Sequence, residues 1–159
     1  MRDMETKRII SQIEKFHENN WAEVNVDEIF SGIDDEMANK KMPLYNNTIH
    51  QIARHILATE FVVIKRLQGI NYQLKKEEDW IPLDELKKIQ WTNTRDAFIE
   101  SRKEIIFELN KKDDSAIYEP IIENYPTIYD TIHGHLQHSY YHIGQISIIK
   151  KLIEKFYET

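Results

Sequence analysis

Four of the chain's seven histidines lie within ten residues, in the segment HGHLQHSYYH (133–142), and an apolar segment follows them directly. Such imidazoles could form a metal site, a solvated surface patch or a group of core histidines with hydrogen-bond partners. At 100° per residue, His135, His138 and His142 share one face of a helix. We expect them to point inward, and we exclude His133, which falls on the opposite face, as a ligand. The inward face also carries a stripe of apolar residues: Ile146, Ile149, Leu152, Ile153 and Phe156.

The spacing of His138 and His142 is suited to binding a metal ion. Two imidazoles four residues apart on a helix can converge on one ion, with nitrogens about 2.0–2.1 Å from it. Burial strengthens this interpretation, because a polar ring in a core costs free energy unless its nitrogens are paired, and a shared cation would satisfy several rings at once. The alternative is that each ring forms its own hydrogen bond to a carbonyl or a carboxylate. The spacing alone leaves both open.

A third ligand would have to come from another helix. The apolar periodicity of residues 47–67 predicts a helix that carries two more histidines. His55 falls at the edge of the apolar arc of this helix, whereas His50 faces away from it. His55 is thus the predicted third ligand. Three protein ligands would leave coordination positions for water or substrate, as catalytic metal sites do.

Other polar residues near the histidines have both functional and structural interpretations. Gln145 could hold the second nitrogen of a ligand histidine, bind substrate, or bond only to backbone. Tyr140 and Tyr141 are expected to pack at the flanks of the helix. The acidic stretches KKEEDW (75–80) and KKDD (111–114) are expected to be solvated loops.

Glycine and proline are scarce, at four residues each in 159, which favours long helices. Apolar periodicity predicts four of them, at residues 3–18, 47–67, 92–110 and 127–157. Thr92 is the expected cap of the third helix. Short helical pieces at 26–30 and 34–40 are predicted in the long connection between helices one and two, and residues 71–85 should be largely loop. The chain is therefore predicted to be all-α, a four-helix bundle forming one domain over residues 1–159.

Composition excludes several classes of protein. With 27 Asp and Glu against 21 Lys and Arg, and a net charge of −6, the chain lacks the basic stripe that nucleic-acid binding requires. The absence of cysteine rules out disulfides, thiolate metal sites and a cysteine nucleophile. The charged N-terminal segment and the lack of a long apolar run predict no signal peptide, no membrane span and a cytoplasmic location. Only one Glu-x-x-His motif is present, Glu14 to His17, whereas a di-iron carboxylate bundle needs two.

Three stretches of the chain resemble the DinB-like (damage-inducible) superfamily. HSYYHIGQI (138–146) resembles the signature of the last helix in that family, and NNTIHQIARHILATE (46–60) resembles its second-helix motif. The segment that begins NNWAEVNVDEIF and runs over residues 19–43 is similar to the family's connection after the first helix. The resemblance implies a four-helix bundle in which His55, His138 and His142 bind a divalent metal, usually zinc, nickel or iron, often in a homodimer. His135 has no such role in the family, and would support a ligand or only pack in the core.

The resemblance also implies a range of activities. Characterised relatives resemble metal-dependent thiol S-transferases, in which the metal lowers the pKa of a low-molecular-weight thiol such as bacillithiol so that its thiolate attacks an electrophile. Others hydrolyse or isomerise thiol conjugates. A small-molecule substrate and a role in stress or detoxification are therefore expected, as a transferase or a hydrolase. The alternative is a non-enzymatic, stress-related binding module with a structural or vestigial metal site, in which a fourth protein ligand such as His135 would close the coordination sphere.

Overall fold

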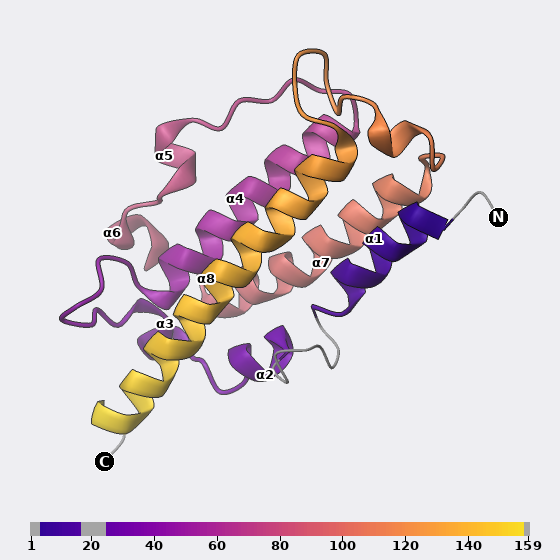
Figure 1. Ribbon diagram of the computed structural model, residues 1–159. Coiled ribbons are helices and arrows are strands. Elements are labelled where there is room, and N and C mark those ends of the chain that lie inside the picture. The colour runs from indigo at the N-terminus through magenta and orange to yellow at the C-terminus, as the bar shows by residue number, and fades with distance from the viewer. Residues whose placement is uncertain (1–3, 17–24, 158–159) are drawn as a thin grey trace.

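Four long helices make up most of the protein, and they pack as an all-α bundle (Figure 1). The computed structural model describes residues 4–16 and 25–157. The long helices are α1 (Met4–Glu14), α4 (Ile49–Leu67), α7 (Trp91–Asn110) and α8 (Ile128–Tyr157). Helix α4 packs against both α7 and α8, and α1 contacts the same two helices. Within the described ranges there is no strand, only one isolated bridge between Pro120 and Thr127, so the predicted fold class is confirmed.

Local sequence signals explain where α4 begins and ends and where α8 begins. Thr48 caps α4 in a capping box with Gln51, because each side chain bonds the backbone N–H of the other residue. The same helix ends before Gly69, whose φ of +80° is the left-handed conformation that glycine adopts without strain. At the start of α8, the Thr127 hydroxyl accepts a hydrogen bond from the backbone N–H of Asp130 at 3.0 Å.

The first and third helices differ from their predicted bounds. Helix α1 ends at Glu14, and the rest of the predicted span, with His17 of the Glu-x-x-His motif, lies outside the described residues. Helix α7 starts at Trp91, so the predicted cap by Thr92 is wrong. Its first N–H instead donates to Asp35 Oδ1 at 2.6 Å, a carboxylate brought from another helix. Trp91 is only 1% exposed, and its burial fixes the start of the helix.

Short helices fill the connections between the long ones. The predicted pieces in the first connection are confirmed as α2 (Val26–Phe30) and α3 (Asp35–Asn39), each capped by the side chain that precedes it. Residues 71–81, here called the strap, run along the outside of α4 (Figure 1). They contain the one-turn helix α5 (Lys76–Asp79) and lead to α6 (Leu83–Leu86), so the predicted loop is irregular but not structureless.

The core is formed by the apolar faces of the long helices. Helix α8 buries Ile146, Ile149 and Ile153 almost completely, and each such side chain contributes about 1.5–3 kcal/mol. The same stripe was expected to bury Phe156, but that side chain is 61% exposed. At 30 residues, α8 is longer than α4 and α7 and projects beyond them at its C-terminal end (Figure 1). The described residues therefore cover Phe156 only in part. No helix among the described residues is long and apolar enough to cross a membrane.

Candidate metal centre

Three histidines from two helices meet between α4 and α8. His55 comes from α4, and His138 and His142 come from α8. One ring nitrogen of each lies within 4.8 Å of those of the other two. The Nε2 atoms of His55 and His138 are 2.9 Å apart, and the three ring centroids are separated by 4.5–4.9 Å. The structure thus brings together the three histidines that the sequence analysis singled out.

The strap fixes the orientation of His55. Its Nδ1–H donates to Asp79 Oδ1 at 2.7 Å, and the indole of Trp80 stacks on the imidazole with centroids 4.1 Å apart and planes 10° apart. A carboxylate partner holds the proton on Nδ1, so the lone pair is on Nε2, which faces the other two histidines. Asp79 therefore selects the tautomer that a metal ligand needs.

Gln145 plays the same part for His142. The Nδ1–H of His142 donates to the amide oxygen of Gln145 at 2.7 Å, and the amide nitrogen of Gln145 donates to the hydroxyl of Tyr141 at 3.2 Å. The lone pair of His142 is consequently on its other nitrogen. Of the alternatives open for Gln145 in the sequence, the structure places it at the second nitrogen of this histidine.

All the pKa shifts found at His138 and His142 favour neutral rings. Burial, with a smaller repulsion from positive charge on His142 and His55, lowers the pKa of His138 to about 4. Burial also lowers the pKa of His142, against a smaller opposite effect of its bond to Gln145. Neutral imidazole is the form that binds a metal ion.

The arrangement fits a cation better than it fits internal hydrogen bonds. With the protons of His55 and His142 directed outward, the nitrogens that face the centre carry lone pairs, and a proton on His138 could satisfy only one of them. His138 Nδ1 is buried with no hydrogen-bond partner among the described residues, so no protein group fixes the tautomer of this ring. Three lone pairs at these separations are a donor set for a divalent ion at about 2.0–2.1 Å from each nitrogen, after a small inward movement.

His135 lies beside this cluster but belongs to a different set of contacts. It is 8% exposed, and its Nε2 lies 3.6 Å from Glu60 Oε1 and 3.4 Å from Ser139 Oγ. Glu60 is fully buried and forms an ion pair with Arg102, whose guanidinium also lies over the rings of Phe16 and Phe98. The three-histidine group identified among the described residues does not include His135. It is a core histidine in a buried charged network.

The two remaining described histidines also lie away from the cluster. His133 packs its ring on Tyr129 on the outer side of α8, with centroids 4.3 Å apart. His50 was expected to face away from the apolar arc, and it does turn from the cluster, but it is 0% exposed. Its Nδ1–H donates to Asn39 Oδ1 at 3.1 Å and its Nε2 accepts from Thr94 Oγ1 at 2.8 Å. Helices α3 and α7 cover a face that the periodicity of α4 alone marks as outer.

Two acidic stretches were expected to be solvated, and this was wrong for one aspartate in each. Asp79, in KKEEDW, is the partner of His55. Asp114, in KKDD, accepts hydrogen bonds from the backbone N–H groups of Glu5 and Thr6. These N–H groups lie in the first turn of α1 and have no partner within the helix. The signal for Asp79 is the tryptophan that follows it, because a large aromatic side chain in a charged loop indicates a segment that packs back on the bundle.

The protein is an all-α bundle whose second and last long helices carry inward-facing histidines. These features are typical of helical bundles that hold a metal ion between facing helices. The sequence model of the DinB superfamily matches residues 18–146, which include all three histidines. The chain belongs to the DinB superfamily, whose members often bind metal. No curated protein matches the chain.

Proposed function

We propose that the protein is a metal-dependent enzyme, a thiol S-transferase or a hydrolase, that activates a small thiol or water at a divalent ion held by His55, His138 and His142. The observation that supports this most strongly is the orientation of the rings. Two of the three histidines have their outer nitrogens bonded to Asp79 and Gln145, and the inner nitrogens converge. A purely structural histidine cluster has no need of this arrangement, because its rings can be satisfied one by one.

Three protein ligands support a catalytic site over a closed structural one. A structural zinc site has four protein ligands, and a catalytic site keeps a position for water or substrate. His135, the residue that could have closed the sphere, is held by Glu60 and Ser139 instead. When bound, zinc, nickel or iron would act as a Lewis acid that lowers the pKa of a thiol or of water.

The chain's own residues would position this chemistry. Asp79 and Gln145 keep the rings of His55 and His142 in the ligand tautomer, and Trp80 covers one face of His55 against solvent. Because the chain has no cysteine, a nucleophilic sulfur must arrive with the substrate. In the transfer reaction the thiol proton leaves to solvent, sulfur forms a bond to the electrophilic carbon, and the leaving group departs with its electron pair.

The proposal includes a homodimer in the cytoplasm, with a low-molecular-weight thiol as the small-molecule partner. Support for self-association comes from one end of the bundle, where Leu44, Phe156 and Tyr157 are 94%, 61% and 47% exposed and line a shallow pocket. Large apolar side chains clustered on a surface are typical of protein interfaces.

The test is an activity assay on metal-loaded protein. Protein freed of metal is reloaded with zinc, nickel or ferrous iron and given low-molecular-weight thiols with a chromogenic electrophile, and in a second series a chromogenic ester or amide. His142→Ala is compared with the wild type at equal folded concentration, and His133→Ala is the matched control. We expect catalysis above background in the wild type and the control, and none in His142→Ala. Equal rates in all three proteins would contradict the proposal and favour a non-enzymatic binding module.

A further inference from the structure

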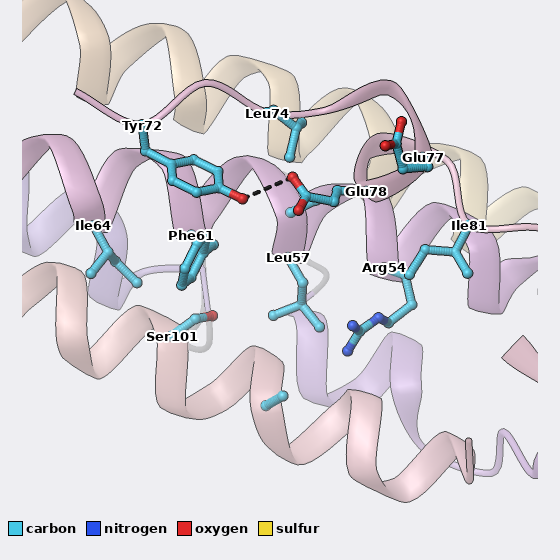
Figure 2. A pocket seen from close by; sticks show the side chains of 12 residues that line it. Arg54, Leu57, Phe61, Ile64, Tyr72, Leu74, Glu77, Glu78, Ile81 and Ser101 are labelled. Atoms are coloured by element: carbon cyan, nitrogen blue, oxygen red, sulfur yellow. Dashed lines mark hydrogen bonds between the residues drawn. The ribbon is translucent and has the colours of Figure 1, made fainter. Parts of the chain in front are cut away.

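A pocket of about 660 Å³ lies beside α4, and Figure 2 shows the side chains that line it. Helix α4, helix α7 and the strap form its walls, and none of the three clustered histidines lines it. Its surface is mainly apolar, and the side chains responsible come from α4 and the strap: Leu57, Phe61, Ile64, Leu74 and Ile81. Small-molecule sites in proteins have this size and this mainly apolar lining, with a few polar groups that fix orientation.

The strap wall is fastened to α4 at several points, so the pocket is preformed. Gln51 Nε2 donates to the carbonyl of Ile81 at 3.1 Å, and the ring of Tyr72 meets Phe61 edge-on with centroids 5.1 Å apart. The bond between Asp79 and His55 adds a third attachment. A ligand would therefore enter an existing cavity and would not have to order the strap.

Arg54 is the one cationic side chain among the residues that line this pocket. Its guanidinium points between α4 and α7, and its Nε is buried without a hydrogen-bond partner in the described part of the chain. Burial lowers the pKa of Arg54, with no offsetting effect of an acidic group. A guanidinium nevertheless stays charged in a protein, and partly buried charges are normally paired. Arg54 therefore lacks the anion that such a position requires.

The acidic and hydroxyl groups of the pocket do not supply that anion. Glu78 accepts hydrogen bonds from the Tyr72 hydroxyl at 2.8 Å and from the backbone N–H of Lys75 at 3.0 Å. Ser101 donates to the buried Glu60. The carboxylate of Glu77 points away from Arg54, toward the outer side of the strap (Figure 2). The pocket thus contains one cationic group without a counter-ion, at one end of an apolar cavity.

We propose that this pocket binds a small aliphatic carboxylate, whose head group pairs with the Arg54 guanidinium and whose chain lies against Leu57 and Phe61. Guanidinium and carboxylate match each other in a two-bond geometry, which gives both affinity and orientation. The apolar walls account for the chain, because they offer it no hydrogen-bond partner. The site is separate from the metal centre and does not depend on the activity proposed for it.

The test uses hexanoate, octanoate and decanoate below their micellar concentrations, with octanol as the uncharged analogue. Binding is measured by titration calorimetry and by shifts of the backbone amide signals of residues 54–64 and 72–81. We expect octanoate to bind the wild type at least tenfold more tightly than octanol does. Arg54→Gln should weaken octanoate about tenfold or more, as loss of a charge-assisted bond does, while leaving octanol unchanged. Arg95→Gln, an exposed arginine paired with Asp96, is the matched control and should change neither.

Two further variants establish whether octanoate occupies this pocket or the metal centre. Ala58→Phe fills part of the cavity while Arg54 is kept, and it should weaken the binding of both octanoate and octanol. His142→Ala should bind octanoate as the wild type does, which excludes coordination of the carboxylate at the metal centre. The proposal is overturned if none of the three carboxylates binds, if Arg54→Gln leaves their affinity unchanged, or if the amide shifts fall around His142 instead of along α4 and the strap.

Discussion

The histidines inside this bundle fall into two groups that differ in their partners more than in their burial, with only His138 partly exposed. His50 and His135 each contact polar groups of the protein, at Asn39 and Thr94 for the first and at Glu60 and Ser139 for the second. The cluster of His55, His138 and His142 instead turns its inner nitrogens toward one another. Burial of a histidine therefore does not identify a ligand. What distinguishes the cluster is that its inner nitrogens face one another, and a proton on His138 can satisfy only one of the lone pairs that His55 and His142 direct inward.

The groups bonded to the outer ring nitrogens of the cluster reinforce this difference. Asp79 and Gln145 fix protons on the outer nitrogens of two clustered rings, and this directs lone pairs into the centre. For His50 the two partners are complementary, one accepting and one donating, so the ring is complete without an ion. The comparison predicts that changes near His50 and His135 act on stability, and changes in the cluster act on metal binding.

The largest stability effect is expected at the network around His135. Burial raises the pKa of Glu60, but attraction to Arg102 together with the contacts to His135 and Ser101 outweighs this, so the net pKa is lowered and the pair is ionised. Glu60→Ala would leave Arg102 as an uncompensated buried charge and should cost about 3–5 kcal/mol in urea unfolding. Glu36→Ala, which removes an exposed partner of Lys40, is the control and should cost under about 0.5 kcal/mol. Equal losses of unfolding free energy in the two variants would show that the buried network contributes no more to stability than an exposed ion pair does.

A smaller loss is expected at His50. His50→Ala removes one buried and one partly buried hydrogen bond and leaves a cavity beside Trp91, which should lower the free energy of unfolding by about 2–3 kcal/mol. Metal affinity should stay within twofold of the wild type, measured by competition with a chromogenic chelator. A large loss of metal affinity in a folded His50→Ala protein would break the distinction between the two groups.

Metal affinity should depend on Asp79 more than on its acidic neighbours. Asp79→Ala removes the partner of His55 Nδ1, and loss of such a group typically lowers metal affinity about 10–100-fold, or about 1.4–2.7 kcal/mol. Glu77→Ala, two residues away on the strap, should change it little. If both variants bind metal like the wild type, the strap does not support the site.

Acid should destabilise the protein through His50. Burial and, to a smaller extent, repulsion by Arg54 lower its folded pKa to about 4 against a partial opposing effect of Asp35, while the unfolded value is about 6.5. Since the unfolded chain then binds more protons, the stabilisation is complete above about pH 6.5 and is lost as the pH falls toward 4. Between pH 7 and pH 5 we expect His50 to account for a loss of about 1–2 kcal/mol of stability. Urea unfolding at both pH values should show a smaller drop in His50→Ala than in the wild type, and an equal drop would contradict this.

Helical periodicity was enough to predict the bundle and to bring three distant histidines to one site. His138, His142 and His55 lie on faces that the apolar residues of their own helices define, so sequence spacing carries the information. Asp79 and Asp35 could not be placed in this way. Each is delivered by a short helix to a group on another element, the imidazole of His55 and the first N–H of α7, and such tertiary contacts leave no periodic signal.

Two other misplaced residues have the same origin. Phe156 lies on the inward stripe of α8 but beyond the end of the neighbouring helices, and periodicity does not report where a partner ends. His50 is on the outer face of α4 with respect to α8, yet α3 and α7 cover it. A helical wheel shows which residues share a face, and the packing of the other elements decides whether that face is buried.

Metal binding by single-histidine variants tests the assignment of the cluster most directly. Protein purified without chelator or added metal is analysed for bound metal, and zinc and nickel affinities are then measured by chelator competition for His55→Ala, His138→Ala and His142→Ala. His50→Ala and His133→Ala serve as controls in the same experiment. We expect one ion per chain in the wild type and both controls, and at least a hundredfold weaker binding in each of the three cluster variants. Wild-type affinity in the folded cluster variants would contradict a metal centre at these histidines.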